Sequence, residues 1–164
     1  MKLVLNSTPL IHLTKVSMAY VFKEEYTTPE VKNEVVDKGK KIGAPDALLV
    51  EKIIEGGKVK VIKPKESVLV LFKGIPGLHP ADAEVLALAK EMDATAIIDD
   101  KVERGIARMY GIKNKGSAYF IFREISNGKM TKEKAKKKIN EMIKSSWRCS
   151  IEDYQKIMSE IDKL

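Results

Sequence analysis

Cysteine is nearly absent from this sequence. The 164 residues include one cysteine, Cys149, which excludes an internal disulfide framework and suits a reducing compartment. Long apolar runs are also missing, and a run such as Ser67 to Phe72 is far too short to cross a bilayer. The N-terminus lacks the long apolar stretch and small-residue cleavage site of a signal peptide. We therefore expect a cytoplasmic protein without a membrane segment.

Several widespread catalytic motifs are absent as well. The chain has no P-loop, no GxGxxG turn and no nucleophile elbow, which argues against the enzyme classes built on them. Cys149 has no evident histidine partner, and we interpret it as a packing residue. The chemistry of this chain therefore has to be sought in its acidic side chains.

The charge balance is basic. Lysine and arginine outnumber aspartate and glutamate by 30 to 23, for a formal net charge of +7. This excess favours a polyanionic partner such as nucleic acid, while a solvated lysine-rich surface explains it equally well. The same two interpretations apply to the lysine-rich segment 132–138. The high lysine and glutamate content also suits a heat-adapted source.

Short apolar strands alternate with helices along the chain. We expect strands at 2–5, 25–28, 58–63, 95–98 and 112–113. We expect helices at 10–13, 18–23, from 29 onward, 45–54, 80–92, 102–110, 116–127, 132–143 and 150–164. Gly116-Ser117 is expected to cap the helix that ends near 127. Segment 39–43 reads as a loop, and the pattern of 67–72 does not distinguish helix from strand.

This alternation predicts an α/β fold. We expect three α/β/α layers around a mainly parallel sheet of four to five strands, with helices on both faces. The length suits one domain, which we assign to residues 1–164, with 128–164 as a C-terminal helical hairpin extension.

The stretch Leu78 to Asp100 carries the most informative acids. Pro80 suits the first turn of a helix, and Asp82 lies in that turn, where a carboxylate meets the positive end of the helix dipole. The buried strand that follows ends abruptly in Asp99-Asp100. Open α/β sheets place their ligand sites at the carboxyl ends of such strands.

Two more polar residues are expected near the same sheet edge. Asn6 opens a polar turn after the first strand, where the alternative is a simple helix cap. Glu34 borders the apolar face of the helix after Pro29, where the alternative is a solvated surface residue. Converging carboxylates repel one another unless a cation is present, and oxygen ligands suit Mg²⁺ or Mn²⁺. Such ions support phosphodiester cleavage.

Basic residues beside these acids are candidates for substrate contacts. His79 lies in the loop before Asp82, either as a substrate contact or general acid or as a loop cap. Arg104 and Arg108 share one helix face, which either holds phosphates or faces solvent.

The order of these motifs resembles the PIN-domain family of PilT N-terminus-like nucleases, which includes VapC-type toxins of toxin–antitoxin pairs. The segments that carry the resemblance cover nearly the whole chain and read LVLNSTPLIHL, YTTPEVKNEV, HPADAEVLALA and AIIDDKVERGIA. The resemblance places family acids on Glu34, Asp82 and Asp100, with Asp99 beside the last. The NSTPLI start and the extra C-terminal helices look like a less characterised prokaryotic branch.

The resemblance implies a Mg²⁺- or Mn²⁺-dependent ribonuclease that is often a homodimer. It implies catalytic roles for Glu34, Asp82 and Asp100. The implied metal contacts come from these three residues together with Asn6 and Asp99, and we expect substrate contacts from Ser7, Thr8, His79 and Arg104. RNA is the implied substrate, and a toxin would also have an antitoxin partner.

One position departs from the family pattern. Asn6 stands where the family has its first acid, and a neutral amide lowers the expected affinity for metal. Two hypotheses therefore follow from the sequence. The protein is a metal-dependent ribonuclease, or it is a PIN-like domain that binds RNA or a protein without cutting.

Overall fold

The computed structural model describes all 164 residues and is built on a five-stranded sheet. The strand order is β3-β2-β1-β4-β5, and every neighbouring pair is parallel. The strands are β1 (Leu3–Leu5), β2 (Glu25–Thr27), β3 (Val59–Val61), β4 (Thr95–Ile97) and β5 (Asn114–Lys115). The prediction of an α/β fold with a parallel sheet of four to five strands is confirmed.

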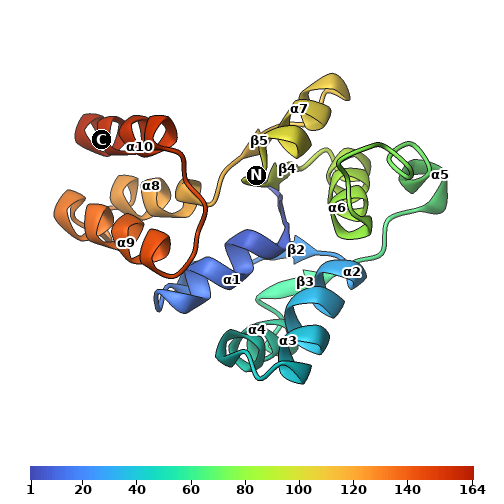
Figure 1. Cartoon of the computed structure of the whole chain (residues 1–164), viewed down its shortest axis with the longest axis horizontal. Coiled ribbons are helices and arrows are strands. Elements are labelled where there is room, and N and C mark those ends of the chain that lie inside the picture. The colour runs from blue at the N-terminus through green and yellow to red at the C-terminus, as the bar shows by residue number, and fades with distance from the viewer.

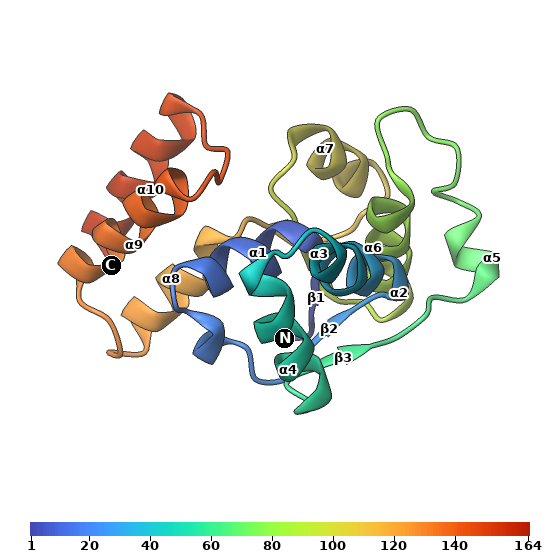
Figure 2. The ribbon, with the colours of Figure 1, turned by 60° about the horizontal axis from the view of Figure 1, so that its bottom comes forward.

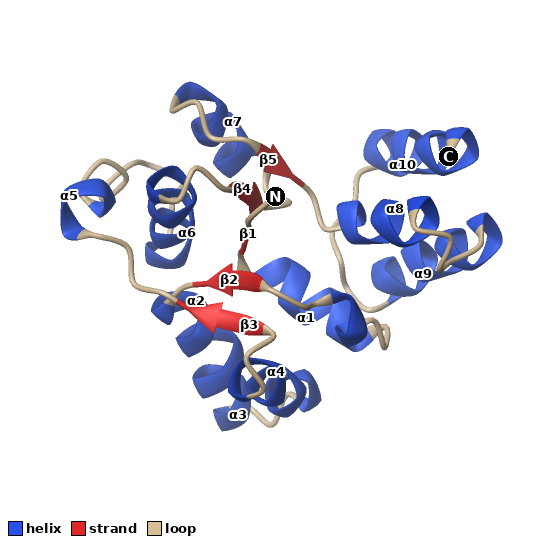
Figure 3. Ribbon diagram, turned by 180° about the vertical axis from the view of Figure 1, so that it is seen from behind, coloured by secondary structure: helices blue, strands red, loops and turns tan.

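Strands β1 and β4 are short and buried at every position, because helices cover both faces of the sheet. Val4 of β1 is paired with Ala96 of β4, and both side chains are completely buried. The two apolar segments that anchor the sequence prediction therefore lie side by side in one sheet. Figure 3 shows the strands running through the middle of the molecule with helices around them.

The helices mostly begin and end where the sequence signals predict. They are α1 (Ser7–Lys15), α2 (Pro29–Lys32), α3 (Lys38–Lys41), α4 (Pro45–Glu55), α5 (Glu66–Leu69), α6 (Pro80–Glu91), α7 (Lys101–Met109), α8 (Ala118–Ser126), α9 (Lys132–Lys144) and α10 (Ile151–Lys163). A 3-10 turn, η1 (Ala19–Val21), and a π-helical segment, η2 (Asn33–Asp37), complete the chain. Thr28 and Thr131 cap α2 and α9 through their side chains, as expected from residue type.

The C-terminal helices form a group of their own. Helices α8, α9 and α10 gather on one side of the molecule, away from α5 and α6 (Figures 1 and 2). Trp147 lies buried at the joint between α9 and α10. The extra C-terminal helices are thus present, and assignment of residues 1–164 to one domain stays a prediction. No helix combines the length and apolar character needed to span a membrane.

Four local predictions were wrong. The segment expected as a loop at 39–43 contains α3, because Gly39 is buried against α4 and the helix from Pro29 continues through η2. The segment expected as a helix at 18–23 is only the turn η1, and the last strand lies at Asn114–Lys115 rather than 112–113. Ser117, expected to cap α8, has helical backbone angles and makes no capping hydrogen bond, because its hydroxyl is used elsewhere. The undecided region 67–72 contains the short helix α5.

Adding a methyl group at Gly39 is expected to destabilise the fold by about 1–3 kcal/mol. A Cβ atom there would lie 2.9 Å from the Ala47 Cβ, too close for the contact between α3 and α4. Gly105 is the matched control, because a Cβ on that helical residue would meet only the end of Arg108, 4.0 Å away. Gly105→Ala should gain about 0.5–1 kcal/mol from helix propensity. Urea unfolding measures the free energy of unfolding of both variants. A Gly39→Ala variant as stable as the wild type would contradict the close packing of α3 on α4.

Candidate active site

The candidate site lies at the carboxyl edge of β1 and β4. Asn6 follows β1 directly, and its backbone N–H donates to the carbonyl of Ile97 in β4 at 3.2 Å. Its side-chain oxygen accepts the Ser7 N–H at 2.8 Å and so caps α1. Asn6 is 8 % exposed, and its position is fixed by the strand, the helix and the neighbouring strand.

The amide nitrogen of Asn6 joins two carboxylates. Asn6 Nδ2 donates to Asp82 Oδ1 at 2.9 Å and to both carboxyl oxygens of Glu103 at 3.0 Å. The side-chain oxygen of Asn6 is thus used in capping α1, and the expected contact of Asn6 with a metal stays a prediction. The amide nitrogen presents its hydrogen atoms, and their partial positive charge stabilises two acids that would otherwise repel each other.

Glu103 reaches this centre from the first turn of α7. Its backbone N–H donates to Asp100 Oδ1 at 2.9 Å, which caps the helix and fixes the start of α7. Glu103 is 2 % exposed. This burial, together with the negative charge of Asp82, raises the pKa of the Glu103 carboxyl group to about 9. Glu103 therefore carries a proton near neutral pH when no cation is present.

Asp82 approaches from the first turn of α6. Its Oδ2 accepts the backbone N–H of His79 at 2.9 Å, as in a capping box, and leaves Oδ1 for Asn6. The side chain of Asp82 is half-buried, and His79 is exposed at the rim. The sequence signals of proline, acid and helix start thus place Asp82 correctly beside Asn6.

Glu34 lies across a hollow of about 420 Å³ from these residues. It is exposed on η2, and π-helical segments of this kind often occur at functional sites. Ser7 Oγ is buried and has no hydrogen-bond partner. The hollow is lined by Asn6, Ser7, Thr8, Glu30, Glu34, Lys38, His79, Pro80, Ala81 and Asp82.

Asp99 belongs to a different set of contacts. Its Oδ1 accepts the Ser117 N–H at 2.8 Å, and its Oδ2 accepts the hydroxyl of Ser117 and the indole N–H of Trp147. The carboxylate is therefore occupied in joining the end of β4 to α8 and to the α9–α10 joint. Asp100 is exposed and serves as the cap of α7.

The structure thus places the expected site residues around three neighbouring hollows. One hollow collects Asn6, Ser7, Thr8, Glu34, His79 and Asp82. An adjacent pocket contains Asp99 and Arg104, and a third hollow contains Thr8, Asp99 and Asp100. Metal-ligand and catalytic roles for these residues stay predictions.

Sequence reasoning missed Glu103. The available signal was its spacing from Ala107, four residues later on α7, since both side chains are buried and face inward. Arg104 and Arg108 lie on another, basic side of the same helix. Contact between Glu103 and Asn6 spans 97 residues, which no local pattern reveals.

The donor chemistry fits a hard divalent cation. Asp82, Glu103 and Glu34 offer carboxylate oxygens, and the orphaned Ser7 hydroxyl adds an unused oxygen beside them. In this arrangement no group of three or more acidic, histidine or cysteine side chains lies close enough together to hold a metal ion. The Asn6 amide occupies the space between two of the acids, and side-chain rotation is needed to gather them.

Comparison with known proteins adds an independent line of support. The family model DUF3368, described as a PIN domain, matches residues 2–163. The protein named endoribonuclease Nob1 of Pyrococcus abyssi is 38 % identical over 120 residues, covering 69 % of this chain and 66 % of that protein. Endoribonuclease Nob1 of Methanocaldococcus jannaschii is 33 % identical over 116 residues, covering 64 % of this chain and 55 % of that protein.

The chain therefore spans somewhat less than two thirds of the length of each Nob1 relative. Among solved structures, a PilT N-terminus domain protein from the hyperthermophilic archaeon Sulfolobus solfataricus aligns with a TM-score of 0.45 at 16 % identity. That alignment covers 73 % of this chain and 90 % of the other.

Proposed function

Because the chain belongs to the PIN-domain family, we propose that it is a metal-dependent endoribonuclease that cuts RNA at the carboxyl edge of its sheet. The resemblance noted in the motif order is confirmed by the family match. The observation that carries the proposal is the joining of Asp82 and Glu103 through the Asn6 amide at that edge. The similarity to two proteins named endoribonuclease supports RNA as the substrate.

Asp82, Glu103 and Glu34 are the residues we propose to hold Mg²⁺ or Mn²⁺. A bound ion of this kind supplies an activated water and neutralises charge on the scissile phosphate. Glu103 then provides the carboxylate that the family pattern places at position 6. Asp100 acts by fixing the helix that carries Glu103, and Asp99 stays outside the metal set because its oxygens are occupied.

Polar residues around the hollow are suited to binding the RNA backbone. Lys38 and His79 lie at its rim and are exposed, so they are available to a phosphate. Ser7 and Thr8 line the same hollow beside Asn6. We propose that these side chains orient the RNA strand across the acids.

One observation also supports the alternative of a PIN-like domain that binds RNA without cutting. The Asn6 amide satisfies both acids in the absence of metal, so the site is stable without a cation. The similarity to Nob1 gives no support to a toxin role. The homodimer and the antitoxin partner implied by the family resemblance stay predictions.

The test is RNA cleavage by the purified protein. We expect single-stranded RNA to be cut with Mg²⁺ or Mn²⁺ and to stay intact with EDTA. Asp82→Asn removes one charge from the metal set and should weaken Mn²⁺ binding by about tenfold, as measured by titration. If the wild-type protein binds Mn²⁺ and RNA but does not cut RNA with any metal tested, the nuclease proposal is contradicted. The alternative of an RNA-binding PIN-like domain is then supported.

A further inference from the structure

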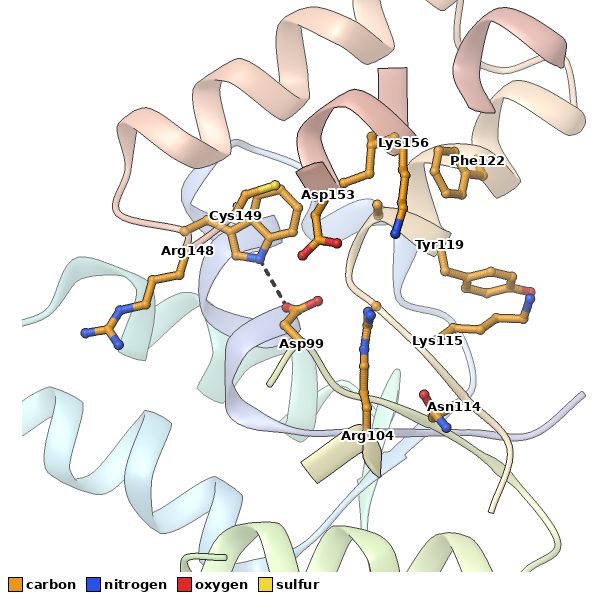
Figure 4. Close-up of a pocket in the computed structure, with 14 residues that line it drawn as sticks. Asp99, Arg104, Asn114, Lys115, Tyr119, Phe122, Arg148, Cys149, Asp153 and Lys156 are labelled. Atoms are coloured by element: carbon orange, nitrogen blue, oxygen red, sulfur yellow. Dashed lines mark hydrogen bonds between the residues drawn. The ribbon is translucent and has the colours of Figure 1, made fainter. Parts of the chain in front are cut away.

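A second pocket, of about 330 Å³, lies beside the acid site. It is formed where β5 and the start of α8 face the N-terminal half of α10. Six of its lining side chains carry the argument, and Figure 4 labels all of them. These six are Asp99, Arg104, Lys115, Tyr119, Asp153 and Lys156.

Two cations enter the pocket from opposite sides. Arg104 points into it from α7, and Lys156 extends toward the same space from α10 (Figure 4). Arg104 Nε donates to the carbonyl of Ile98 at 2.9 Å, which fixes the side chain, while its terminal nitrogens form no ion pair. A fixed guanidinium with free terminal donors is well suited to a phosphate group.

The chain leaves room for this arginine by using glycine at position 116. A Cβ atom on Gly116 would contact the end of Arg104 and lie 2.9 Å from Asp99 Oδ1. Any side chain at 116 would therefore displace both groups. The wall opposite α10 is thus built around the position of the arginine.

An aromatic ring and a free acid complete the pocket. Tyr119 lines one side, with Lys115 Nζ 5.1 Å from the ring centre. Asp153 lies on the other side, and its carboxylate forms no ion pair or hydrogen bond. An aromatic face stacks on a base, and a free carboxylate accepts hydrogen bonds from a base amino group or a 2′-hydroxyl.

The pocket is connected to the acid site through its neighbour. A hollow of about 870 Å³ shares Asp99, Trp147 and Asp153 with it and extends to Thr8 and Asp100. Thr8 also lines the hollow that contains Asp82. The three hollows are thus neighbours in the order acid site, middle hollow, pocket, since each shares lining residues with the next.

We propose that this pocket binds one ribonucleotide of the RNA strand, away from the point of cleavage. Arg104 and Lys156 hold its phosphate, Tyr119 packs against its base, and Asp153 accepts a hydrogen bond from the base or sugar. The inference rests on the proposed function only in taking RNA as the substrate. It does not require that the RNA be cut.

The test is binding of a fluorescein-labelled single-stranded RNA 10-mer to the full chain in EDTA, by fluorescence anisotropy. Lys156→Gln and Tyr119→Leu are each expected to weaken binding by about five- to tenfold, as loss of a phosphate contact or a stacked base does. Lys156→Gln should also lower the slope of affinity against salt concentration by about one, and Tyr119→Leu should leave it unchanged.

Matched controls are Lys163→Gln, in the last turn of the same helix, and Tyr20→Leu, at an exposed tyrosine outside the pocket. Both should bind RNA within about twofold of wild type. Pocket variants that bind like the controls would overturn the proposal. Equal competition by a polyglutamate peptide would also overturn it, because the pocket would then respond to charge alone.

The outcome is separable from that of the nuclease proposal. Pocket-dependent RNA binding without cleavage under any metal supports the nucleotide site and contradicts the nuclease. If the wild type cuts RNA but the Lys156 and Tyr119 variants bind RNA as tightly as the wild type does, the nuclease is supported and the nucleotide site is contradicted.

Discussion

Glu103→Gln is expected to lower metal-dependent RNA cleavage by about 100-fold or more and to weaken Mn²⁺ binding at least tenfold. The substitution keeps the shape of a side chain that is 2 % exposed, so the α7 helix should remain in place. It removes the charge that Glu103 would present to a cation beside Asp82. Titration with Mn²⁺ and single-turnover cleavage measure the two effects separately.

The same logic predicts rescue from position 6. Asn6→Asp restores a carboxylate where Asn6 now contacts Glu103, at 3.0 Å. Alone it should tighten Mn²⁺ binding and destabilise the metal-free protein, because it adds a negative charge beside Asp82 and removes the amide donor that Asp82 now has. Combined with Glu103→Gln, it should return Mn²⁺ affinity to within about threefold of wild type, since the charge count is restored.

The matched control is Asp100→Asn, at the exposed residue that caps α7. Asparagine is an equally good cap, so Mn²⁺ affinity should change much less than in Glu103→Gln. Wild-type affinity and cleavage in Glu103→Gln would contradict the role of Glu103. If the double variant binds Mn²⁺ no more tightly than Glu103→Gln does, a carboxylate at position 6 cannot replace the one at position 103.

Stability of the metal-free protein is expected to fall as pH rises from about 5 to 8. The pKa of Glu103 is raised from 4.5 to about 9 by burial first and by Asp82 second. Between those values the folded protein keeps a proton that the unfolded chain has lost. Each pH unit in this window therefore costs up to about 1.4 kcal/mol of unfolding free energy. The stabilisation is complete below pH 4.5 and is lost through pH 9.

Urea unfolding in EDTA at pH 5, 6.5 and 8 measures this slope. Glu103→Gln is the control, since it removes the titrating group and should be stable to a nearly constant degree across the range. Burial lowers the pKa of His12, so below pH 6.5 this residue makes the unfolding free energy rise with pH. The contribution of His12 is the same in the wild type and in the variant, so it cancels when the two are compared. Equal slopes for wild type and Glu103→Gln would contradict a buried, protonated Glu103.

The sequence was most informative where a feature depends on neighbouring residues. Apolar runs identified β1 and β4, and the combination of proline with an acid identified the start of α6. Asp82 could be placed because a strand end and a helix start fix its position. The family resemblance added the order of the motifs.

Features that depend on contacts between distant segments escaped the sequence analysis. Asp99 and Asp100 are adjacent carboxylates after one strand. Only the positions of Ser117 and Trp147 show why the Asp99 carboxylate contacts these two residues and not the Asn6 amide. Glu103 meets Asn6 across 97 residues. The burial of Gly39 depends on α4, which follows it in the chain.

The contact between Asp99 and Trp147 has a consequence for how the molecule opens. The indole N–H of Trp147 donates to Asp99 Oδ2 at 3.1 Å, and the same oxygen accepts a hydrogen bond from the Ser117 hydroxyl. Detaching the α9–α10 joint would leave a half-buried carboxylate short of one donor at the end of a central strand. Amide hydrogens near Trp147 should therefore exchange with solvent together with those around β4, as parts of one cooperative unit.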